Sequence, residues 1–300
     1  MKKTFIKTIA AAVLTVGLTG CVNDLDISSI DPQSSPEVDP MGLLAKCYAT
    51  LGLTGQDGGD GNGDLSDDEG ESGFYRTTFN LQELPTDEVM WAWQTDQDIP
   101  QITMINWNSS SIRVQWAYTR LTYDITLFNN YLVTVPDNEE NKVNRAEVRF
   151  LRALHYWYLL DLFGKSPFKT EFNIDQLPVE YSGAEMYDWL DKELTEIEPQ
   201  MAEVGAYCNS QSFGRADRGA AYMLHARLAL NSEVYTKGAV KDFDKAIDYC
   251  DKLINSGAYD LSRQAKGGNS GYAQLFMADN DENPEAMQEI ILPIRQDGLR

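Results

Sequence analysis

Apolar side chains recur at helical spacing over most of the chain beyond residue 110, and this pattern predicts a mainly α-helical fold. The first predicted helix covers 112–135, and Pro136 ends it. Its apolar positions are Val114, Tyr118, Leu121, Ile125, Phe128 and Leu132. Further helices are predicted over 144–163 (ended by Gly164), 184–197, 217–231 and 242–257, with a shorter one over 41–53.

The helices at 217–231 and 242–257 have the pattern of a pair. Asp217 and Asp242 stand where N-cap residues are expected. The apolar positions are Ala220, Ala221, Leu224, Leu228 and Ala229 in the first helix, and Phe243, Ala246, Ile247, Cys250, Leu253 and Ile254 in the second. Such a pair resembles a tetratricopeptide (TPR) hairpin, which cannot bury its own faces. We therefore expect it to stack with the helices at 112–135 and 144–163.

Three segments interrupt the helical pattern. Residues 55–73 are rich in glycine and acid and contain no base, so they predict a long loop. Residues 79–107 have little helical periodicity, and 289–294 has the pattern of a strand. The sequence thus predicts paired helices together with an irregular, loop-rich part.

Composition narrows the class of protein. The chain has 300 residues, of which 43% are hydrophobic and 24% charged, as in ordinary globular proteins. Its 46 acidic and 25 basic residues give a net charge of −21, which disfavours nucleic acid and other polyanions as partners of the bulk surface.

The N-terminus has the pattern of a lipoprotein signal peptide over 1–20. Three lysines precede an uncharged run over 8–20 that is too short to span a bilayer. It ends in Leu18-Thr19-Gly20-Cys21, a lipobox, so Cys21 is expected to carry the acyl chains (palmitate among them), unless the signal is cut elsewhere and Cys21 is an ordinary thiol. Residues 21–40 would tether the lipid to a domain over 41–300. The mature chain would have 22 bases against 46 acids, a net charge of −24.

The remaining cysteines and the two histidines give little sign of a metal site. Cys47, Cys208 and Cys250 form no CxxC motif, and both a Cys208–Cys250 bridge and three buried thiols are open. His155 and His225 each lie in an apolar helical stretch, where a packed helix residue is expected rather than a ligand.

Several motifs, in this order, resemble the SusD/RagB family of outer-membrane nutrient-uptake lipoproteins. They are the lipobox at Cys21, Glu83-Leu84-Pro85-Thr86-Asp87-Glu88, Arg149-Phe150-Leu151-Arg152-Ala153-Leu154 with Leu160-Asp161-Leu162-Phe163-Gly164, Gly214-Arg215-Ala216, Asp244-Lys245-Ala246 with Ile254-Asn255-Ser256-Gly257, and Asn283-Pro284-Glu285. The most specific of them is the stretch from Arg149 to Gly164.

The resemblance implies a right-handed superhelical scaffold of TPR-like hairpins that carries an irregular ligand-binding part. It also implies a non-enzymatic protein without a required cofactor, anchored on the outer face of the outer membrane. Such a protein binds oligosaccharides, or peptides in some branches, and partners a SusC-like TonB-dependent transporter. Family members have a further C-terminal portion, which we expect this chain to lack.

The candidate glycan-binding residues lie mainly in 79–107. Trp91 and Trp93 are two apart, so on an extended chain both point to one side and can stack on sugar rings. The further candidates are Tyr75, Asn80, Asp87 and Asp96. The alternative is that the tryptophans belong to the core, which we expect for Trp107, Trp116 and Trp157.

The acidic loop suggests a calcium site. Its oxygen-bearing residues stand at alternate positions of a calcium-loop template, namely Asp60, Asn62, Asp64, Ser66, Asp68 and Glu71. However, Leu65 stands where the template needs glycine, so a solvated acidic loop is the alternative.

Four functions compete at this point. They are glycan capture, peptide capture by the same architecture, hydrolysis by a carboxylate pair such as Asp87 and Asp96, and a TPR-type adaptor that binds only proteins. The chain contains no G-x-S-x-G, HExxH or P-loop motif, which disfavours hydrolysis. The two tryptophans favour glycans over peptides.

Overall fold

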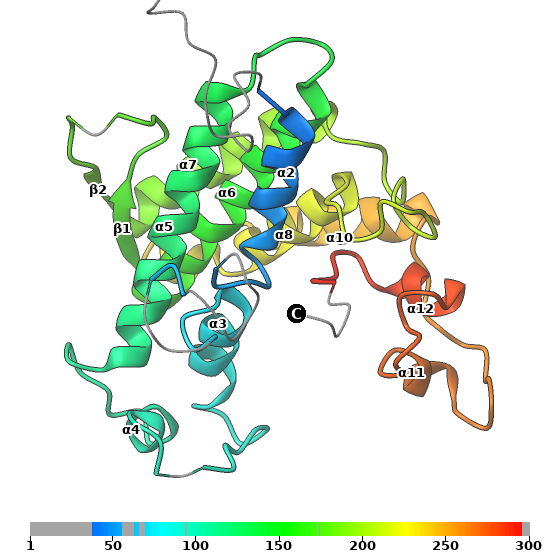
Figure 1. The fold of residues 1–300 in the computed structure, drawn as a ribbon, viewed down its shortest axis with the longest axis horizontal. Helices are drawn as coiled ribbons and strands as arrows, with labels where there is room; N and C mark the ends of the chain where they lie inside the picture. The colour runs from blue at the N-terminus through cyan, green and yellow to red at the C-terminus, as the bar shows by residue number, and fades with distance from the viewer. Residues whose placement is uncertain (1–37, 56–62, 66–69, 94, 174, 296–300) are drawn as a thin grey trace, which may run out of the picture. The chain divides into compact units, whose positions relative to one another are not determined.

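The computed structural model describes residues 38–55, 63–65, 70–93, 95–173 and 175–295 (Figure 1). Residues 40–300 cluster as one compact unit. The predicted signal peptide, Cys21 and most of the tether lie outside the described residues. Within the described part, no helix is both long enough and apolar enough to cross a bilayer.

The helices predicted from periodicity are confirmed. They are α2 (Pro40–Ala49), α5 (Ile112–Thr134), α6 (Lys142–Phe163), α7 (Gly183–Ile197), α8 (Arg218–Leu230) and α10 (Phe243–Ser256). α5 stops where Val135 turns extended before Pro136, and Gly164 ends α6 in the left-handed conformation, with φ 71°. Both ends were predicted from the sequence.

Shorter elements complete the fold. They are α3 (Phe74–Glu83), α4 (Ile99–Thr103), β1 (Lys165–Phe168), β2 (Val179–Ser182), the 3₁₀ turn η2 (Glu198–Gln200), α9 (Ser232–Tyr235), α11 (Gly271–Gln274) and α12 (Pro284–Glu289). β1 and β2 pair antiparallel, with Lys165 opposite Ser182. The predicted strand at 289–294 is wrong: Glu289 closes α12, and the residues that follow it form no strand.

The core lies where α5, α6 and α7 run side by side, with α2 on one side of them and the α8–α10 pair beyond (Figure 1). One continuous cluster of buried apolar side chains joins α2, α5, α6, α7 and α8. The prediction that the hairpin helices stack against α5 and α6 is confirmed only in part, because α8 packs chiefly against α7 and to a lesser extent against α6. α3 and α4 extend from this scaffold at the same end as the first turns of α5.

The two predicted N-caps have different outcomes. Asp217 accepts hydrogen bonds from the backbone N–H groups of Gly219 (2.8 Å) and Ala220 (3.3 Å), as a cap should. Asp242 makes no cap bond, because its carboxylate instead accepts the hydroxyl hydrogen of Tyr187 across the α7–α10 interface at 2.5 Å.

The apolar face of α10 also differs from the prediction. The side chains that it buries are Ala246, Tyr249 and Leu253, whereas Phe243, Ile247 and Ile254 are exposed. α10 packs mainly against α8, with side-chain contacts to α7 at Asp242 and Lys245, and this packing buries a narrower stripe than the sequence pattern suggests.

The three described cysteines are free thiols, so a Cys208–Cys250 bridge is wrong. Cys47 lies on the buried face of α2, and burial raises the pKa of its thiol to about 12. This thiol is therefore protonated and unreactive at neutral pH.

Both histidines are fully buried helix residues, as predicted. The two ring nitrogens of His225 each face an acceptor: Nδ1 lies 2.5 Å from Glu198 Oε1, and Nε2 lies 3.3 Å from Asp191 Oδ1. Only the doubly protonated ring can donate to both. Burial alone would lower the pKa of His225, but the hydrogen bonds to Asp191 and Glu198 outweigh it and raise this pKa.

This raised pKa predicts a pH-dependent contribution to stability. The protonated ring stabilises the fold fully below the unfolded-state pKa of about 6.5, and the contribution is lost as pH rises through the raised folded-state pKa. We expect the difference in free energy of unfolding between wild type and His225→Gln to be largest near pH 6 and to shrink towards pH 9. Urea titrations at several pH values measure it, with the surface variant Glu139→Gln as control; a difference independent of pH would contradict the prediction.

Candidate functional site

Trp93 presents an aromatic face to solvent. It lies between α3 and α4, in the segment that carries both predicted platform tryptophans, and it is 68% exposed. Its ring centroid is 6.1 Å from that of Trp91, with the two planes inclined at 64°. The two rings therefore lie side by side, but they are not equivalent.

Trp91 is half-buried beneath this surface. Its indole Nε1 donates to Asp96 Oδ2 at 3.0 Å, and its ring packs against a small apolar cluster formed by Leu84, Ile99 and Ile102. A side chain held by both packing and a hydrogen bond is fixed in orientation. Trp91 therefore supports Trp93, and Trp93 is the ring that is free to stack on a ligand.

Two arginines that sequence reasoning did not single out flank Trp91. The guanidinium carbons of Arg76 and Arg113 each lie 5.5 Å from the centroid of the Trp91 ring, within cation–π range. Arg113, 6% exposed, also lies 5.8 Å from Trp116 and donates through Nε to the carbonyl of Gln97 at 2.9 Å. The sequence contained one indication that Arg113 is buried, because it falls on the apolar side of a periodic helix.

The remaining predicted glycan-binding residues are dispersed. Tyr75 is exposed on α3, with its ring 5.8 Å from that of Phe79, and Asp87 is exposed in the turn after α3. Asp96 is engaged by Trp91 and lies 3.8 Å from Arg113 Nη2. Asn80 is buried in α3, at 2% exposure, so its amide faces the protein rather than solvent.

The three tryptophans that were predicted to belong to the core differ in their burial. Trp157 is buried in α6, and Trp116 is half-buried in α5. Trp107 is 45% exposed, so the prediction that it belongs to the core is wrong. It lies in an irregular stretch just before α5 with no helix to cover it.

The described residues of the acidic loop bind arginines. Asp64 accepts two hydrogen bonds from the fully buried guanidinium of Arg120, at 2.5 and 2.9 Å, and Arg120 also donates to the carbonyl of Ser72 at 2.8 Å. Glu71 accepts from Arg76 and Arg113 through its two oxygens. Of the other predicted calcium ligands, Asp60, Asn62, Ser66 and Asp68 lie outside the described residues. Among described residues, no cluster of three or more acidic, histidine or cysteine side chains could hold a metal ion.

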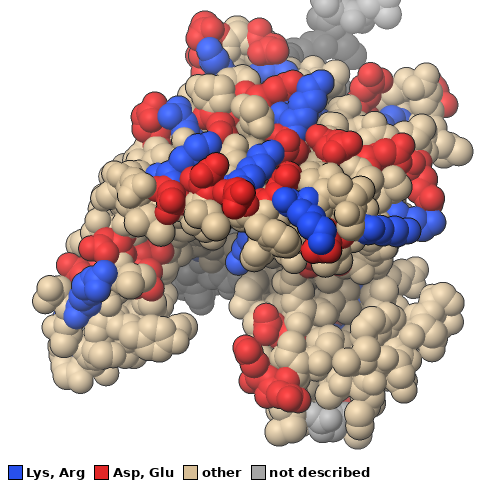
Figure 2. All heavy atoms as spheres, turned by 180° about the vertical axis from the view of Figure 1, so that it is seen from behind, with Lys and Arg blue, Asp and Glu red and all other residues tan. Residues whose placement is uncertain are grey.

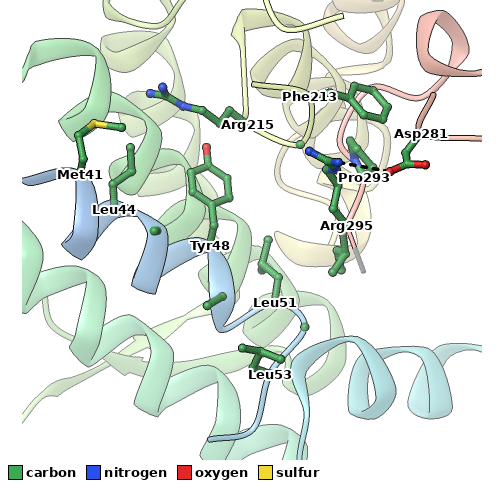
Figure 3. A pocket seen from close by; sticks show the side chains of 15 residues that line it. Met41, Leu44, Tyr48, Leu51, Leu53, Phe213, Arg215, Asp281, Pro293 and Arg295 are labelled. Atoms are coloured by element: carbon green, nitrogen blue, oxygen red, sulfur yellow. Dashed lines mark hydrogen bonds and ion pairs between the residues drawn. The ribbon is translucent and has the colours of Figure 1, made fainter. Parts of the chain in front are cut away.

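A separate pocket of about 580 Å³ lies between α2 and the segments around residues 213–215 and 293–295 (Figure 3). Its wall is largely apolar, with Leu44, Leu51 and Pro293 among its residues, and an ion pair of 3.2 Å joins Arg295 to Asp281 on one side. It shares no residue with the Trp91–Trp93 surface. This pocket was not predicted from the sequence, because its walls come from three distant parts of the chain.

The arginine partners generate a prediction about calcium. Asp64→Ala leaves a buried guanidinium short of its main acceptor, so we expect it to lower the free energy of unfolding by about 2–3 kcal/mol. The loss should be the same in EDTA and in millimolar calcium, measured by thermal and urea unfolding. Asp137→Ala, at an exposed acid, is the control. A calcium-dependent rise in the melting temperature of wild type that is absent from Asp64→Ala would contradict this account.

Several known proteins are similar to this chain in sequence or in fold. No family model matches the chain. The starch-binding protein SusD of Bacteroides thetaiotaomicron is 54% identical over the whole chain, which spans 53% of that protein's length. The surface glycan-binding protein A of Bacteroides uniformis has a TM-score of 0.62 at 20% identity, covering 84% of this chain and 51% of its own.

A third relative was solved with a ligand. The surface glycan-binding protein A of Bacteroides thetaiotaomicron, in complex with laminarihexaose, has a TM-score of 0.62 at 16% identity, covering 85% of this chain and 48% of its own. The chain thus spans about half the length of these relatives. The identity along its whole length and the shared fold place it in one group: the chain belongs to the SusD/RagB family of SusD-like proteins.

Proposed function

We propose that this chain is the glycan-capturing part of a surface lipoprotein that binds oligosaccharides without chemically altering them. The observation that carries the proposal is the exposed indole of Trp93 on a fixed backing. Sugar rings present flat C–H faces, and an aromatic ring that is already ordered contacts them with little loss of conformational entropy.

Polar groups beside the Trp91 ring can hydrogen-bond to sugar hydroxyls. Arg76 is 36% exposed at its side chain and supplies guanidinium N–H donors, and the Asp96 carboxylate supplies acceptor oxygens. A neutral oligosaccharide also agrees with the net charge of −21. In addition, acidic and basic side chains interleave over the face of the helical scaffold seen in Figure 2, with no broad basic area there for a polyanion.

The relatives narrow the ligand class. One is named for binding starch, and another was solved with laminarihexaose. Both ligands are glucans, so we propose a glucan oligosaccharide as the ligand. Peptide capture by the same architecture is the alternative, and the exposed indole favours the sugar.

The proposal assigns no catalytic residue. In the predicted hydrolase pair, Asp96 is bound by the Trp91 indole and lies beside the Arg113 guanidinium, whereas Asp87 is exposed. Nor does the proposal assign calcium a role, since the described acids of the loop bind arginines.

We further propose that Cys21 carries the lipid that anchors the protein to the outer membrane, facing outwards. The partner would be a SusC-like TonB-dependent transporter that receives the ligand. The lipobox and the family assignment support this proposal. Labelling with radioactive palmitate, and its loss in Cys21→Ala, would test the anchor.

Trp93→Ala tests the proposed ligand surface. We expect the affinity for maltoheptaose or laminarihexaose, whichever wild type binds, to fall by about tenfold or more, because a stacked ring and its buried apolar area are lost. Isothermal titration calorimetry measures the affinity, and the melting temperature should change little because Trp93 is exposed.

Two controls sharpen the test. Trp107→Ala removes an exposed tryptophan outside the Trp91–Trp93 pair, and we expect it to keep the wild-type affinity. Wild-type binding to neither sugar, or Trp93→Ala binding as tightly as wild type, would contradict the proposed site.

A further inference from the structure

One carboxylate joins the two arginines that flank Trp91. Glu71 accepts from Arg76 through Oε1 and from Arg113 through Oε2. The side chains of Glu71 and Arg113 are only 14% and 7% exposed, so solvent screens this contact weakly. Without the carboxylate, the two cations would face one indole, with Asp96 3.8 Å from Arg113 Nη2.

Arg113 connects this ion pair to the tryptophan segment in three ways. Its guanidinium lies between the rings of Trp91 and Trp116, at 5.5 and 5.8 Å. Its Nε donates to the carbonyl of Gln97, and its Nη2 lies 3.8 Å from Asp96, the acceptor of the Trp91 indole. The planar guanidinium thus makes contacts that a lysine ammonium could not reproduce together.

The tryptophan segment depends on such contacts because its own backbone bonds are local. Within 85–98 these bonds form short turns, such as Asp96 N to Trp93 O at 3.1 Å. Its long-range ties to α5 include the Arg113 bond to Gln97 and a bond from the Ile112 N–H to the Asp98 carboxylate. Local turns of this kind open at low free-energy cost unless side chains attach them to a rigid element.

We infer that Glu71 is a positioning residue for the ligand surface, acting through Arg113 and Arg76 to hold Trp91 beneath Trp93. This inference rests on the proposed function for its effect on affinity. It also gives Glu71, at the end of the acidic loop, a role that needs no metal ion. Without the Glu71 carboxylate, the two guanidiniums can separate. Trp91 then loses the cation–π contacts that hold it beneath Trp93.

The test compares Glu71→Gln with a matched control, Glu193→Gln. Glu193 is also a buried carboxylate between two guanidiniums, those of Arg149 (2.7 Å) and Arg152 (2.9 Å), but it lies on α7. We expect Glu71→Gln to weaken binding of maltoheptaose or laminarihexaose by about fivefold or more, in EDTA and in calcium alike, while Glu193→Gln keeps wild-type affinity. Calorimetry provides both values.

A second readout needs no ligand. Hydrogen exchange followed by mass spectrometry should show faster exchange over 85–98 in Glu71→Gln and unchanged exchange there in Glu193→Gln. Should Glu71→Gln fail to fold, Arg113→Lys keeps the charge but loses the planar contacts, and we expect the same signature from it.

The outcomes separate the two proposals. Wild-type affinity in Glu71→Gln, where Trp93→Ala has lost binding, overturns the positioning role. If Trp93→Ala binds as wild type, the proposed site fails and hydrogen exchange alone decides: faster exchange over 85–98 supports the role of Glu71, and unchanged exchange overturns it.

Discussion

The burial of two arginine side chains on α5 is the constraint on which the ligand surface depends. Arg113 and Arg120 are seven residues apart, two helical turns, so both project from the same face of the helix. A guanidinium removed from water is tolerated only when carboxylates and carbonyls satisfy its donors. The acidic loop supplies them: Glu71 binds Arg113, and Asp64 and the carbonyl of Ser72 bind Arg120.

The strength of this attachment follows from the charges involved. Burial lowers the pKa of Arg120, but the hydrogen bond to Asp64 and the nearby Asp124 outweigh burial and raise this pKa. Asp64, Glu71 and Ser72 are thereby fixed to α5, and α3, which begins at Phe74, starts from a fixed point. A rigid helix thus determines the position of a segment that has no regular structure of its own.

The same kind of contact recurs at other junctions of the fold. Glu147, fully buried on α6, accepts from Arg215, Tyr48 and Tyr207, which join it to α2 and to the irregular segment before α8. Glu193 on α7 joins two arginines of α6. Apolar packing assembles the helices, and charge-assisted hydrogen bonds between distant residues join some helices to one another and attach irregular segments to them.

These two kinds of interaction also explain what could be predicted from the sequence. Helices were predictable because apolar periodicity is local, and Gly164 and Pro136 mark their ends. Trp93 could be singled out because polar residues follow it. The contacts of Asp64 with Arg120 and of Glu71 with Arg113 join residues 56 and 42 positions apart, and no local pattern reports such a pairing. The burial of Asn80 was not predictable either, because it depends on how the short helix α3 packs on the scaffold.

The separation of the exposed indole from its buried support has an evolutionary consequence. Trp93 touches solvent over most of its surface, so replacing it, or residues beside it, alters the ligand surface while leaving the buried ion pairs intact. Lineages that share this scaffold can therefore alter the proposed ligand surface by substitutions of small stability cost. Exchange of Glu71 or Arg113, in contrast, is constrained, since either change removes one half of a largely buried ion pair.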